Sequence, residues 1–210
     1  MKTDLLDIRN CDCMELMALH DDNHFDLAIV DPPYGINVNV SMGRRKGDLK
    51  SSYHKFAGGD SCAPEKDYFH ELRRISKNQI IWGANHFIDR NPVNSSCWIA
   101  WDKGFSDEVT FATFELAWTS FTSTCKMFRG HPNAQSRIHP TQKPVKLYDW
   151  ILKHYAKEGD KILDTHMGSG SIAIACHYSK NHLTACELDK DYYTLACDRI
   201  SRETQQTTML

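Results

Sequence analysis

Short hydrophobic runs recur along the chain, and segments with a helical hydrophobic period separate several of them. Seven runs have the length and residue types of β-strands: residues 5–8, 25–30, 79–82, 97–101, 114–118, 161–163 and 183–186. Residues 64–76 and 144–156 each carry one hydrophobic stripe typical of an amphipathic helix, and a further helix is expected over 172–178. The alternation predicts an α/β protein with an open sheet, in which ligands bind beyond the carboxyl ends of the strands.

Two connections between these elements, residues 36–63 and 119–140, are long enough to be candidate functional loops. Only residues 205–210 are expected to form a frayed end. A chain of 210 residues has the size of one domain, so we expect a single domain over 1–210. The first residues lead directly into a strand, and no hydrophobic run approaches the ~20 residues of a membrane span. We therefore expect a cytoplasmic protein without a membrane segment.

Composition narrows the chemistry only slightly. A net charge of −2 neither favours nor excludes a nucleic acid partner, so any electrostatic argument depends on local clusters. The eight cysteines are scattered through hydrophobic segments without a Cys-x-x-Cys pair, and we expect mostly buried, reduced thiols. The eleven histidines also lack the paired spacing of metal ligands, which predicts a protein without a metal.

The sharpest chemical signal is the segment Asp31-Pro32-Pro33-Tyr34, directly after the predicted strand 25–30. The exocyclic amine of adenine or cytosine is a poor nucleophile, because its lone pair is delocalised into the ring. If Asp31 and the carbonyl of Pro32 accept hydrogen bonds from the amino group, the nitrogen becomes pyramidal and its lone pair can attack. The prolines fix these acceptors, and Tyr34 offers a stacking surface for a base flipped out of double-stranded DNA. The alternative is a rigid loop without chemistry.

A second signal is the segment 164–171, Asp-Thr-His-Met-Gly-Ser-Gly-Ser, between a predicted strand and a predicted helix. Its glycines allow the backbone to approach a ligand at the start of the helix. Glu187 ends the next strand 17 positions after Gly170, where it can accept hydrogen bonds from both hydroxyls of a ribose. The pattern predicts a nucleoside site, and a turn that uses glycine for steric reasons alone is the alternative. Neither a G-x-G-x-x-G pattern nor a Walker lysine is present, which argues against dinucleotides and nucleoside triphosphates.

The two motifs together resemble those of the DNA amino-methyltransferases, which carry Asp-Pro-Pro-Tyr and a separate Gly-rich cofactor motif. The order, with the catalytic motif first, resembles the permuted beta group of that family, as do segments 81–87, 98–103, 114–118 and 139–144. The resemblance implies a Rossmann-like α/β fold with a mixed seven-stranded sheet and helices on both faces. It also implies methyl transfer from S-adenosylmethionine, with S-adenosylhomocysteine as product, to N6 of adenine in DNA.

The resemblance further implies roles for single residues. His139, Thr141 and Lys143 would lie beside the methionine portion of the cofactor, and Asp12 near its adenine amino group. The predicted catalytic residues are Asp31, Pro32, Pro33 and Tyr34, and the predicted cofactor-binding residues are Asp12, Asp31, His139, Thr141, Lys143, Asp164, His166, Gly168, Ser169, Gly170, Ser171 and Glu187. Taken singly, His139 could be a loop residue, Lys143 a solvated charge and Asp12 a helix cap.

One position departs from the family pattern. The family usually has Asp-Pro-Phe before its Gly-Ser-Gly, whereas this chain has Asp164-Thr165-His166. We expect His166 to cover the cofactor as an aromatic substitute for phenylalanine, and weakened cofactor binding is the alternative.

Two basic segments are candidates for contact with DNA phosphates. Residues 116–148 contain no Asp or Glu but include Lys126, Arg129 and Arg137, while Arg44, Arg45 and Lys46 lie between glycines in the loop 36–63. Solvated loops without a partner are the alternative. Neither segment is long enough to be a separate recognition domain. A second subunit in a homodimer is therefore a hypothesis, which rests on the small size of the chain and on the habit of the family.

Adenine is the preferred target, because adenine enzymes of the family commonly begin the catalytic motif with Asp and many cytosine-N4 members begin it with Ser. Cytosine-N4 methylation of DNA is the first alternative, and methylation of RNA or of a protein amide fits the same acceptors. A catalytically inactive cofactor-binding subunit or nucleic-acid-binding module would keep the sheet without the chemistry.

Overall fold

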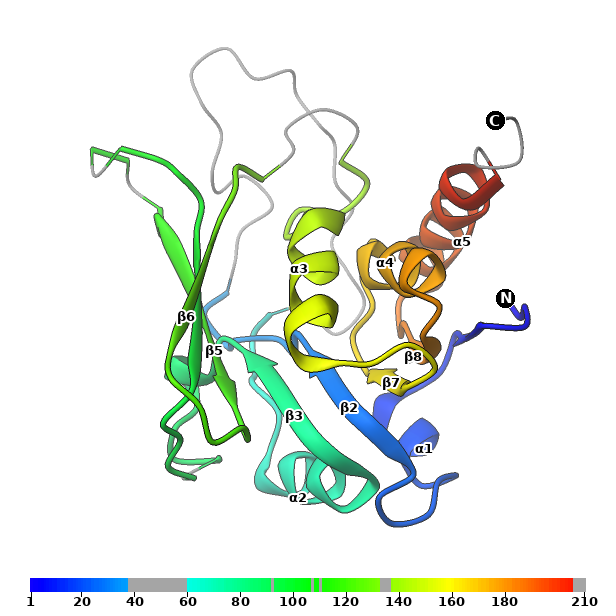
Figure 1. The fold of residues 1–210 in the computed structure, drawn as a ribbon, viewed down its shortest axis with the longest axis horizontal. Coiled ribbons are helices and arrows are strands. Elements are labelled where there is room, and N and C mark those ends of the chain that lie inside the picture. The colour runs from blue at the N-terminus through cyan, green and yellow to red at the C-terminus, as the bar shows by residue number, and fades with distance from the viewer. Residues whose placement is uncertain (38–59, 92, 107, 110, 133–136, 206–210) are drawn as a thin grey trace.

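The computed structural model describes residues 1–37, 60–91, 93–106, 108–109, 111–132 and 137–205. Its strands form one sheet of eight in the order β1-β8-β7-β2-β3-β5-β4-β6, and β2 and β3 lie near its centre in Figure 1. Their bounds are β1 Leu6–Arg9, β2 Phe25–Val30, β3 Ser76–Trp82, β4 Trp98–Asp102, β5 Phe114–Thr119, β6 Lys126–Arg129, β7 Lys161–Asp164 and β8 His182–Cys186. Strand β5 pairs antiparallel with both β3 and β4, whereas the other paired strands run parallel. The sheet is therefore mixed, with one reversed strand among those described.

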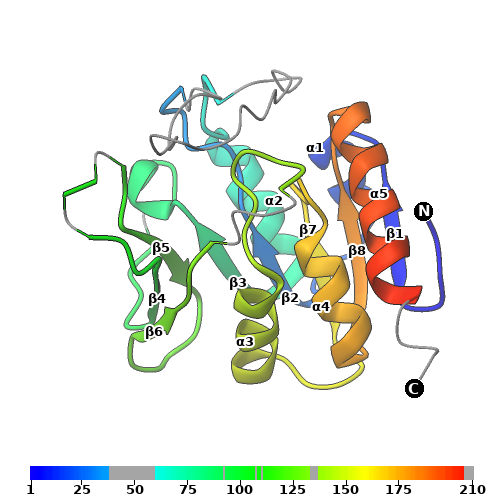
Figure 2. The ribbon, with the colours of Figure 1, turned by 90° about the horizontal axis from the view of Figure 1, so that it is seen from above.

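Helices cover both faces of the sheet, as Figure 2 shows from above. One face carries α3 (Val145–Tyr155), α4 (Ser171–Ser179) and α5 (Lys190–Gln205), and the other carries α1 (Cys13–Met17) and α2 (Lys66–Ile75). A short 3-10 turn, η1 (Ala84–His86), follows β3.

Successive residues of the central strand β2 enter different cores. Leu27 and Ile29 pack with the helices α3 to α5, whereas Ala28 and Val30 pack with α1 and α2. A parallel strand that is buried on both faces needs hydrophobic side chains at nearly every position. This is why the run 25–30 was recognisable from the sequence with its bounds unchanged.

The expected mixed α/β sheet with helices on both faces is confirmed, but the expected number of seven strands is wrong, because the structure has eight. The additional strand is β6, which lies inside the region 119–140 that was interpreted as a loop. Its sequence Lys-Met-Phe-Arg contains two basic residues, and among the described strands it pairs only with β4, at the edge of the sheet. Short, charged edge strands are weak sequence signals, because half of their side chains face water. Helix α5 is also not predicted from the sequence, and α1 is anticipated only by the interpretation of Asp12 as a helix cap.

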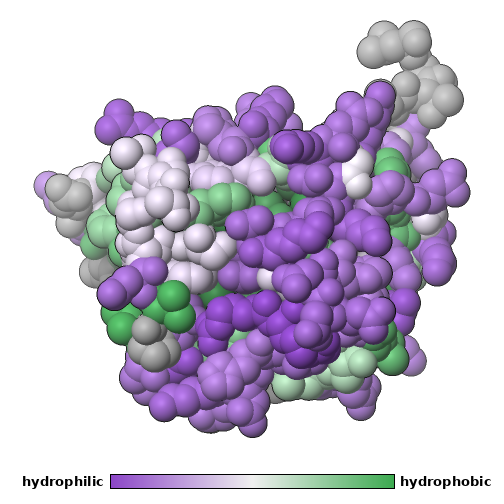
Figure 3. Space-filling model, turned by 60° about the horizontal axis from the view of Figure 1, so that its bottom comes forward, coloured by the Kyte–Doolittle hydropathy of each residue, from purple (hydrophilic) through white to green (hydrophobic). Residues whose placement is uncertain are grey.

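The prediction of mostly buried thiols is only partly correct. All eight cysteines are free thiols, but only Cys97, Cys176 and Cys186 are buried, and Cys62 and Cys125 are exposed. The lower face of the molecule in Figure 1, brought forward in Figure 3, is mostly hydrophilic, with hydrophobic residues in small areas. Among the described helices, none is both long and hydrophobic enough to cross a membrane.

The strand directions bring distant segments to one edge of the sheet. Strands β1, β8, β7, β2 and β3 are parallel, so the loops that follow them leave from the same edge. Because β5 is reversed, its first residues reach that same edge. The predicted catalytic segment, the Gly-rich turn and Glu187 all lie at or after the carboxyl ends of these strands.

Candidate active site

The Asp31–Tyr34 segment leaves β2 at the carboxyl edge, and its tyrosine is held on several sides. The Tyr34 hydroxyl donates to Asp31 Oδ1 over 2.8 Å, and the Tyr34 backbone N–H donates to Asp60 Oδ1 over 2.6 Å. A Cβ atom at Gly83 would lie 2.1 Å from the Tyr34 ring, so only glycine permits this close approach. The exposed His86 ring stacks on Tyr34 with centroids 5.2 Å apart. The Tyr34 ring is thus fixed between the catalytic segment and the turn after β3.

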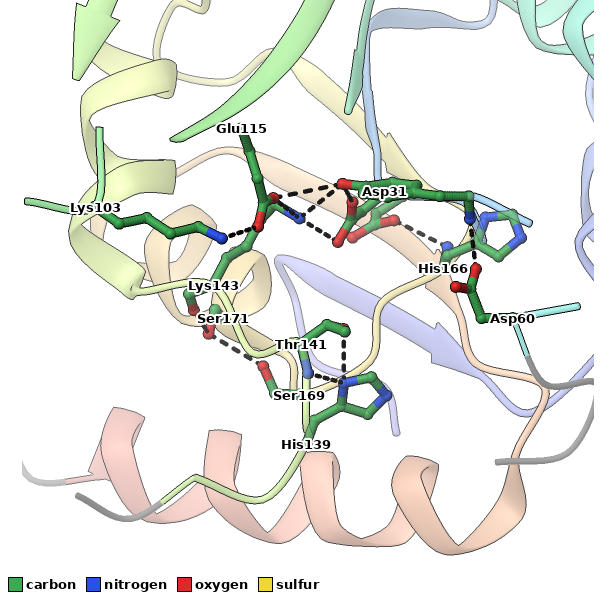
Figure 4. Close-up of polar contacts among 12 residues, drawn as sticks. Asp31, Asp60, Lys103, Glu115, His139, Thr141, Lys143, His166, Ser169 and Ser171 are labelled. Carbon is green, nitrogen blue, oxygen red and sulfur yellow. Dashed lines mark hydrogen bonds and ion pairs between the residues drawn. The ribbon is translucent and has the colours of Figure 1, made fainter. Parts of the chain in front are cut away.

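Four charged side chains of alternating sign meet beside this tyrosine (Figure 4). Lys143 Nζ forms an ion pair with Asp31 Oδ2 and lies 3.2 Å from Glu115 Oε2. Lys103 Nζ lies 2.6 Å from the other oxygen of Glu115. The Lys143 side chain is only 3% exposed, so its interpretation as a solvated surface charge is wrong.

Burial and neighbouring charges act on these groups in opposite directions. Burial raises the pKa of the Asp31 carboxyl and the charge of Glu115 raises it further, whereas Lys143 acts against both. Burial alone would also raise the pKa of Glu115, but the ammonium groups of Lys143 and Lys103 outweigh it and lower that pKa to about 2. For Lys143, the two carboxylates outweigh burial and raise the pKa. Glu115 is therefore the more firmly ionised of the two carboxyl groups.

The Gly-rich turn between β7 and α4 uses its two glycines for different reasons. Gly170 has φ +74°, and a Cβ atom there would lie 2.8 Å from Ile200, so the steric interpretation applies to this position. Gly168 has φ +54°, but a Cβ atom there would make ordinary contacts, the nearest 3.7 Å away at His139. Gly170 therefore allows the turn to pack against α5. Gly168 leaves free space beside the backbone on the side of His139.

Two carboxyl groups flank this turn, and backbone N–H groups hold both. Glu187 Oε2 accepts from Gly168 N over 2.8 Å, and its Oε1 accepts from Asp189 N over 3.0 Å. Asp164 Oδ1 accepts from His166 N over 2.9 Å. Burial raises the pKa of Asp164 to about 8 and also raises that of Glu187. Asp164 is buried and Glu187 is half-buried, and both carboxyl groups are acceptors suited to hydroxyl or ammonium groups of a ligand.

Of the two histidines expected beside the cofactor, His166 is part of the turn itself and His139 lies beside Gly168. His139 Nδ1 lies 3.1 Å from Thr141 Oγ1, and burial lowers the pKa of His139 to about 4. His166 Nδ1 lies 2.9 Å from Thr165 Oγ1, and burial lowers its pKa to about 4 as well. Both rings are therefore neutral near pH ~7.

The remaining predicted cofactor residues make contacts within the protein. Ser171 Oγ donates to the Lys143 carbonyl over 2.7 Å, which ties the turn to the segment before α3. The Ser169 carbonyl accepts from Arg199 over 3.0 Å. Asp12 is the N-cap of α1 and accepts from Met14 N over 2.7 Å, as the helix-cap interpretation expects. The two serines and Asp12 thus have structural roles whether or not they also contact a ligand.

The basic residues considered for DNA contact are not all at this edge. Arg129 ends β6 beside Asp102, with 3.4 Å between Arg129 Nε and Asp102 Oδ2, and its side chain is 78% exposed. Lys126 begins the same strand and lies at its opposite end. Arg137 precedes His139 in the chain and is half-buried. Arg44, Arg45 and Lys46 lie outside the described residues.

Sequence reasoning missed three residues of this site: Asp60, Lys103 and Glu115. Glu115 had a usable signal, because it is the one charged residue in the hydrophobic run Phe-Glu-Leu-Ala-Trp-Thr of β5. Asp60 had no such signal, since it lies at the end of a long connection. Among the described residues, no group of three or more His, Cys, Asp or Glu side chains is arranged to hold a metal ion.

The fold and the site define an α/β protein in which an acidic cluster and a Gly-rich turn share one edge of a mixed sheet. The model of a family described as DNA methylase matches residues 76–198, and the chain belongs to this family. The matched region includes Glu115, Lys143, the Gly-rich turn and Glu187, while the Asp31 segment precedes it.

Individual proteins are similar to this chain in part of the sequence or in fold. The chain is 32% identical over 71 residues to the type II methyltransferase M.HpaI of Haemophilus parainfluenzae, a match that spans 34% of this chain and 23% of that protein. Its fold is similar to that of M1.HpyAVI in complex with SAM, with a TM-score of 0.62, 18% identity and coverage of 93% of this chain and 100% of the other. It is also similar to the PvuII DNA methyltransferase, described as cytosine-N4-specific, with a TM-score of 0.65, 12% identity and coverage of 98% and 93%.

Proposed function

We propose that this protein is an S-adenosylmethionine-dependent DNA methyltransferase that acts on the N6 amino group of adenine. The observation that carries the proposal is the Asp31 carboxyl, bonded to Tyr34 and lying at the same sheet edge as the Gly-rich turn. A base amine bound between them would have a hydrogen-bond acceptor on one side and a methyl donor on the other. Membership of the DNA methylase family supports this class of reaction.

The chemistry of the groups around the turn fits S-adenosylmethionine. The Glu187 carboxyl suits the hydroxyls of a ribose, and the buried Asp164 carboxyl suits the ammonium of an amino acid portion. The neutral rings of His139 and His166 suit uncharged, flat or apolar parts of the ligand. When bound, S-adenosylmethionine supplies a methyl group on a positively charged sulfur, and S-adenosylhomocysteine is the product.

The Asp31–Tyr34 segment would activate the base nitrogen. Asp31 and the Pro32 carbonyl accept the two amino hydrogens, which localises the nitrogen lone pair and aims it out of the plane of the base. The Tyr34 hydroxyl orients the Asp31 carboxyl through a 2.8 Å hydrogen bond. Positive charge develops on the nitrogen as it gains the methyl group, and the Asp31 carboxylate stabilises it. Because burial raises its pKa, Asp31 is also a better acceptor for the proton that the nitrogen must lose.

Adenine is proposed over cytosine because the catalytic motif begins with Asp31. The likeness to the cytosine-N4-specific PvuII enzyme concerns the fold and does not decide between the two bases. A binding module without chemistry is the candidate from another class, and the buried charges around Asp31 argue against it, since such a module has no use for them.

Nucleoside mass spectrometry tests the proposal. The full chain is incubated with S-adenosylmethionine and duplex DNA, and the DNA is digested to nucleosides. We expect N6-methyladenine, and none with the Asp31→Ala variant. N4-methylcytosine would replace the proposal by its first alternative, and DNA binding without any methylated nucleoside would favour the binding module.

Contact with double-stranded DNA is proposed for Arg129, Arg137 and the basic residues 44–46. Two substitutions at opposite ends of β6 test where DNA contacts the protein. Arg129→Ala is expected to weaken DNA binding several-fold and to reduce the salt dependence by about one ion, whereas Lys126→Ala, at the other end of the strand, has a smaller effect. Sedimentation with and without DNA tests the homodimer hypothesis, which a single monomer mass in both would remove.

A further inference from the structure

Glu115 is a charged group that the proposed chemistry does not yet use. It is the second residue of β5, and the reversal of that strand brings it to the edge where Asp31 lies. Its Oε2 lies 3.2 Å from Lys143 Nζ and accepts the Tyr34 hydroxyl at 3.4 Å, while its Oε1 faces Lys103 Nζ at 2.6 Å. Figure 4 shows Glu115 and Asp31 on two sides of the same lysine. Lys143 therefore has two carboxylate partners.

Both oxygens of the Asp31 carboxyl are already engaged. Oδ1 accepts from the Tyr34 hydroxyl, and Oδ2 pairs with the Lys143 ammonium. A base amine that is to donate to Asp31 competes with these groups. The ammonium is the stronger competitor, because a charge-assisted hydrogen bond also withdraws negative charge from the carboxylate. Each carboxylate oxygen has a second lone pair, but Asp31 is the stronger acceptor for the amine when Lys143 turns to its other partner.

Lys143 cannot leave toward water without a large cost. Its side chain is 3% exposed, and a buried ammonium that loses its partner carries an uncompensated desolvation penalty. Glu115 offers a second partner within 3.2 Å, so a small rotation of the lysine side chain keeps the charge paired. Lys103 keeps that second carboxylate ionised from its other side.

We infer that Glu115 is a positioning residue that receives the Lys143 ammonium when the target amino group takes the lysine's place at Asp31. The inference rests on the proposed function. The ammonium gives up its pair with Asp31 and keeps its pair with Glu115, so it stays paired while Asp31 regains its full negative charge for the amine. The low pKa of Glu115, about 2, is consistent with a carboxylate that is always available for this exchange.

A purely structural role for Glu115 makes different predictions. A purely structural residue affects stability and leaves kcat of the folded protein in place at the pH optimum. If Glu115 receives Lys143, Glu115→Gln leaves the lysine on Asp31 and lowers kcat by about 10- to 100-fold, with KM for DNA changed less than about threefold. It also removes a negative charge that raises the Asp31 pKa. The acidic limb of the kcat/KM profile, where Asp31 becomes protonated, then moves to lower pH.

The experiment measures methyl transfer to duplex DNA against pH for the full-length wild type, Glu115→Gln and Glu115→Asp. Glu115→Asp keeps the charge with a shorter reach, so its acidic limb stays at the wild-type position while kcat falls. Asp26→Asn is the matched control, because Asp26 pairs with Lys77 over 2.7 Å at the amino end of β2, away from the site. We expect the control to retain wild-type kcat and pH dependence. Thermal melting checks that each variant folds, and Glu115→Asp carries the test if Glu115→Gln does not.

Two results would overturn the inference alone: an active wild type with unchanged kcat in Glu115→Gln, or a reduced kcat whose acidic limb has not moved. A wild type that transfers no methyl group to DNA would overturn the proposed function, and this inference with it. The two failures are therefore distinguishable.

Discussion

The two halves of the site hold their carboxyl groups in different ways. Asp31 is held by side chains: the Tyr34 hydroxyl from its own segment and the Lys143 ammonium from the segment before α3, which also pairs with Glu115 on β5. Around the Gly-rich turn, Asp164 and Glu187 are held by backbone N–H groups of nearby residues. Side-chain ion pairs can exchange partners, whereas backbone donors keep their places. The first arrangement suits a step in which charge moves, and the second suits a preformed binding surface.

Removal of the Asp31 carboxyl is the test of this difference with the largest expected effect. Asp31→Ala is expected to lower turnover by about 10³-fold or more, because the acceptor of the amino hydrogens is lost. The dissociation constant for S-adenosylmethionine should change little, since the proposed contact is to the base. Isothermal titration with the cofactor and a methyl transfer assay measure the two effects, and substantial remaining turnover would refute the role of Asp31.

The second prediction concerns the loss of folding stability that ionisation of the buried Asp164 causes at high pH. Its folded pKa, about 8, is raised above the usual 3.8 by burial, so the folded state binds the proton more tightly. The free energy of unfolding therefore falls as pH rises from about 4 to about 8. The Asp164→Asn variant cannot ionise at this position and so does not lose this stability. At high pH its free energy of unfolding is expected to exceed that of the wild type by ~1.4 kcal/mol for each unit by which the folded pKa of Asp164 is raised.

Chemical denaturation at about pH 5 and about pH 9 measures this difference. His139 and His166 titrate in both proteins, so their contribution cancels in the comparison. If the difference in the free energy of unfolding between Asp164→Asn and the wild type does not grow with pH, ionisation of Asp164 does not destabilise the folded protein. Backbone donors would then hold this half of the site better than we infer.

Glu187→Ala tests the binding half directly. We expect the dissociation constant for S-adenosylmethionine to rise about 10- to 100-fold, which corresponds to ~1.4–2.8 kcal/mol. Turnover at saturating cofactor should fall much less, because Glu187 is not expected to contact the base. An unchanged dissociation constant would count against the ribose assignment.

Gly83→Ala is expected to cost ~1–3 kcal/mol of stability. A Cβ atom there would overlap the Tyr34 ring, and the residue has φ +69°. Gly159→Ala is the matched control, because Gly159 has φ +85° with no atom within 4 Å of the added Cβ. The difference between the two variants in thermal denaturation therefore measures the close approach of Tyr34 apart from backbone strain. Equal losses in both would mean that the Tyr34 ring adapts.

The candidate functional residues at the ends of strands could be predicted from the sequence, because they lie in contiguous segments. Asp31 and Glu187 follow hydrophobic runs whose bounds are nearly those of β2 and β8. The edge strand β6 was missed because its alternating, partly basic sequence is similar to that of an exposed loop. Lys143 was found through a resemblance, and nothing local indicated that its side chain is buried against two carboxylates.

The sequence by itself determined the order of the elements, the two motifs and their place after strands, since hydrophobic period and local motifs act over a few neighbouring residues. The tertiary structure alone decided that β5 runs in reverse and brings Glu115 to Lys143 and Asp31. Contacts between residues 31, 115 and 143 depend on how strands far apart in the chain pair. That pairing is settled by the packing of the whole sheet between its helices, which no short segment encodes.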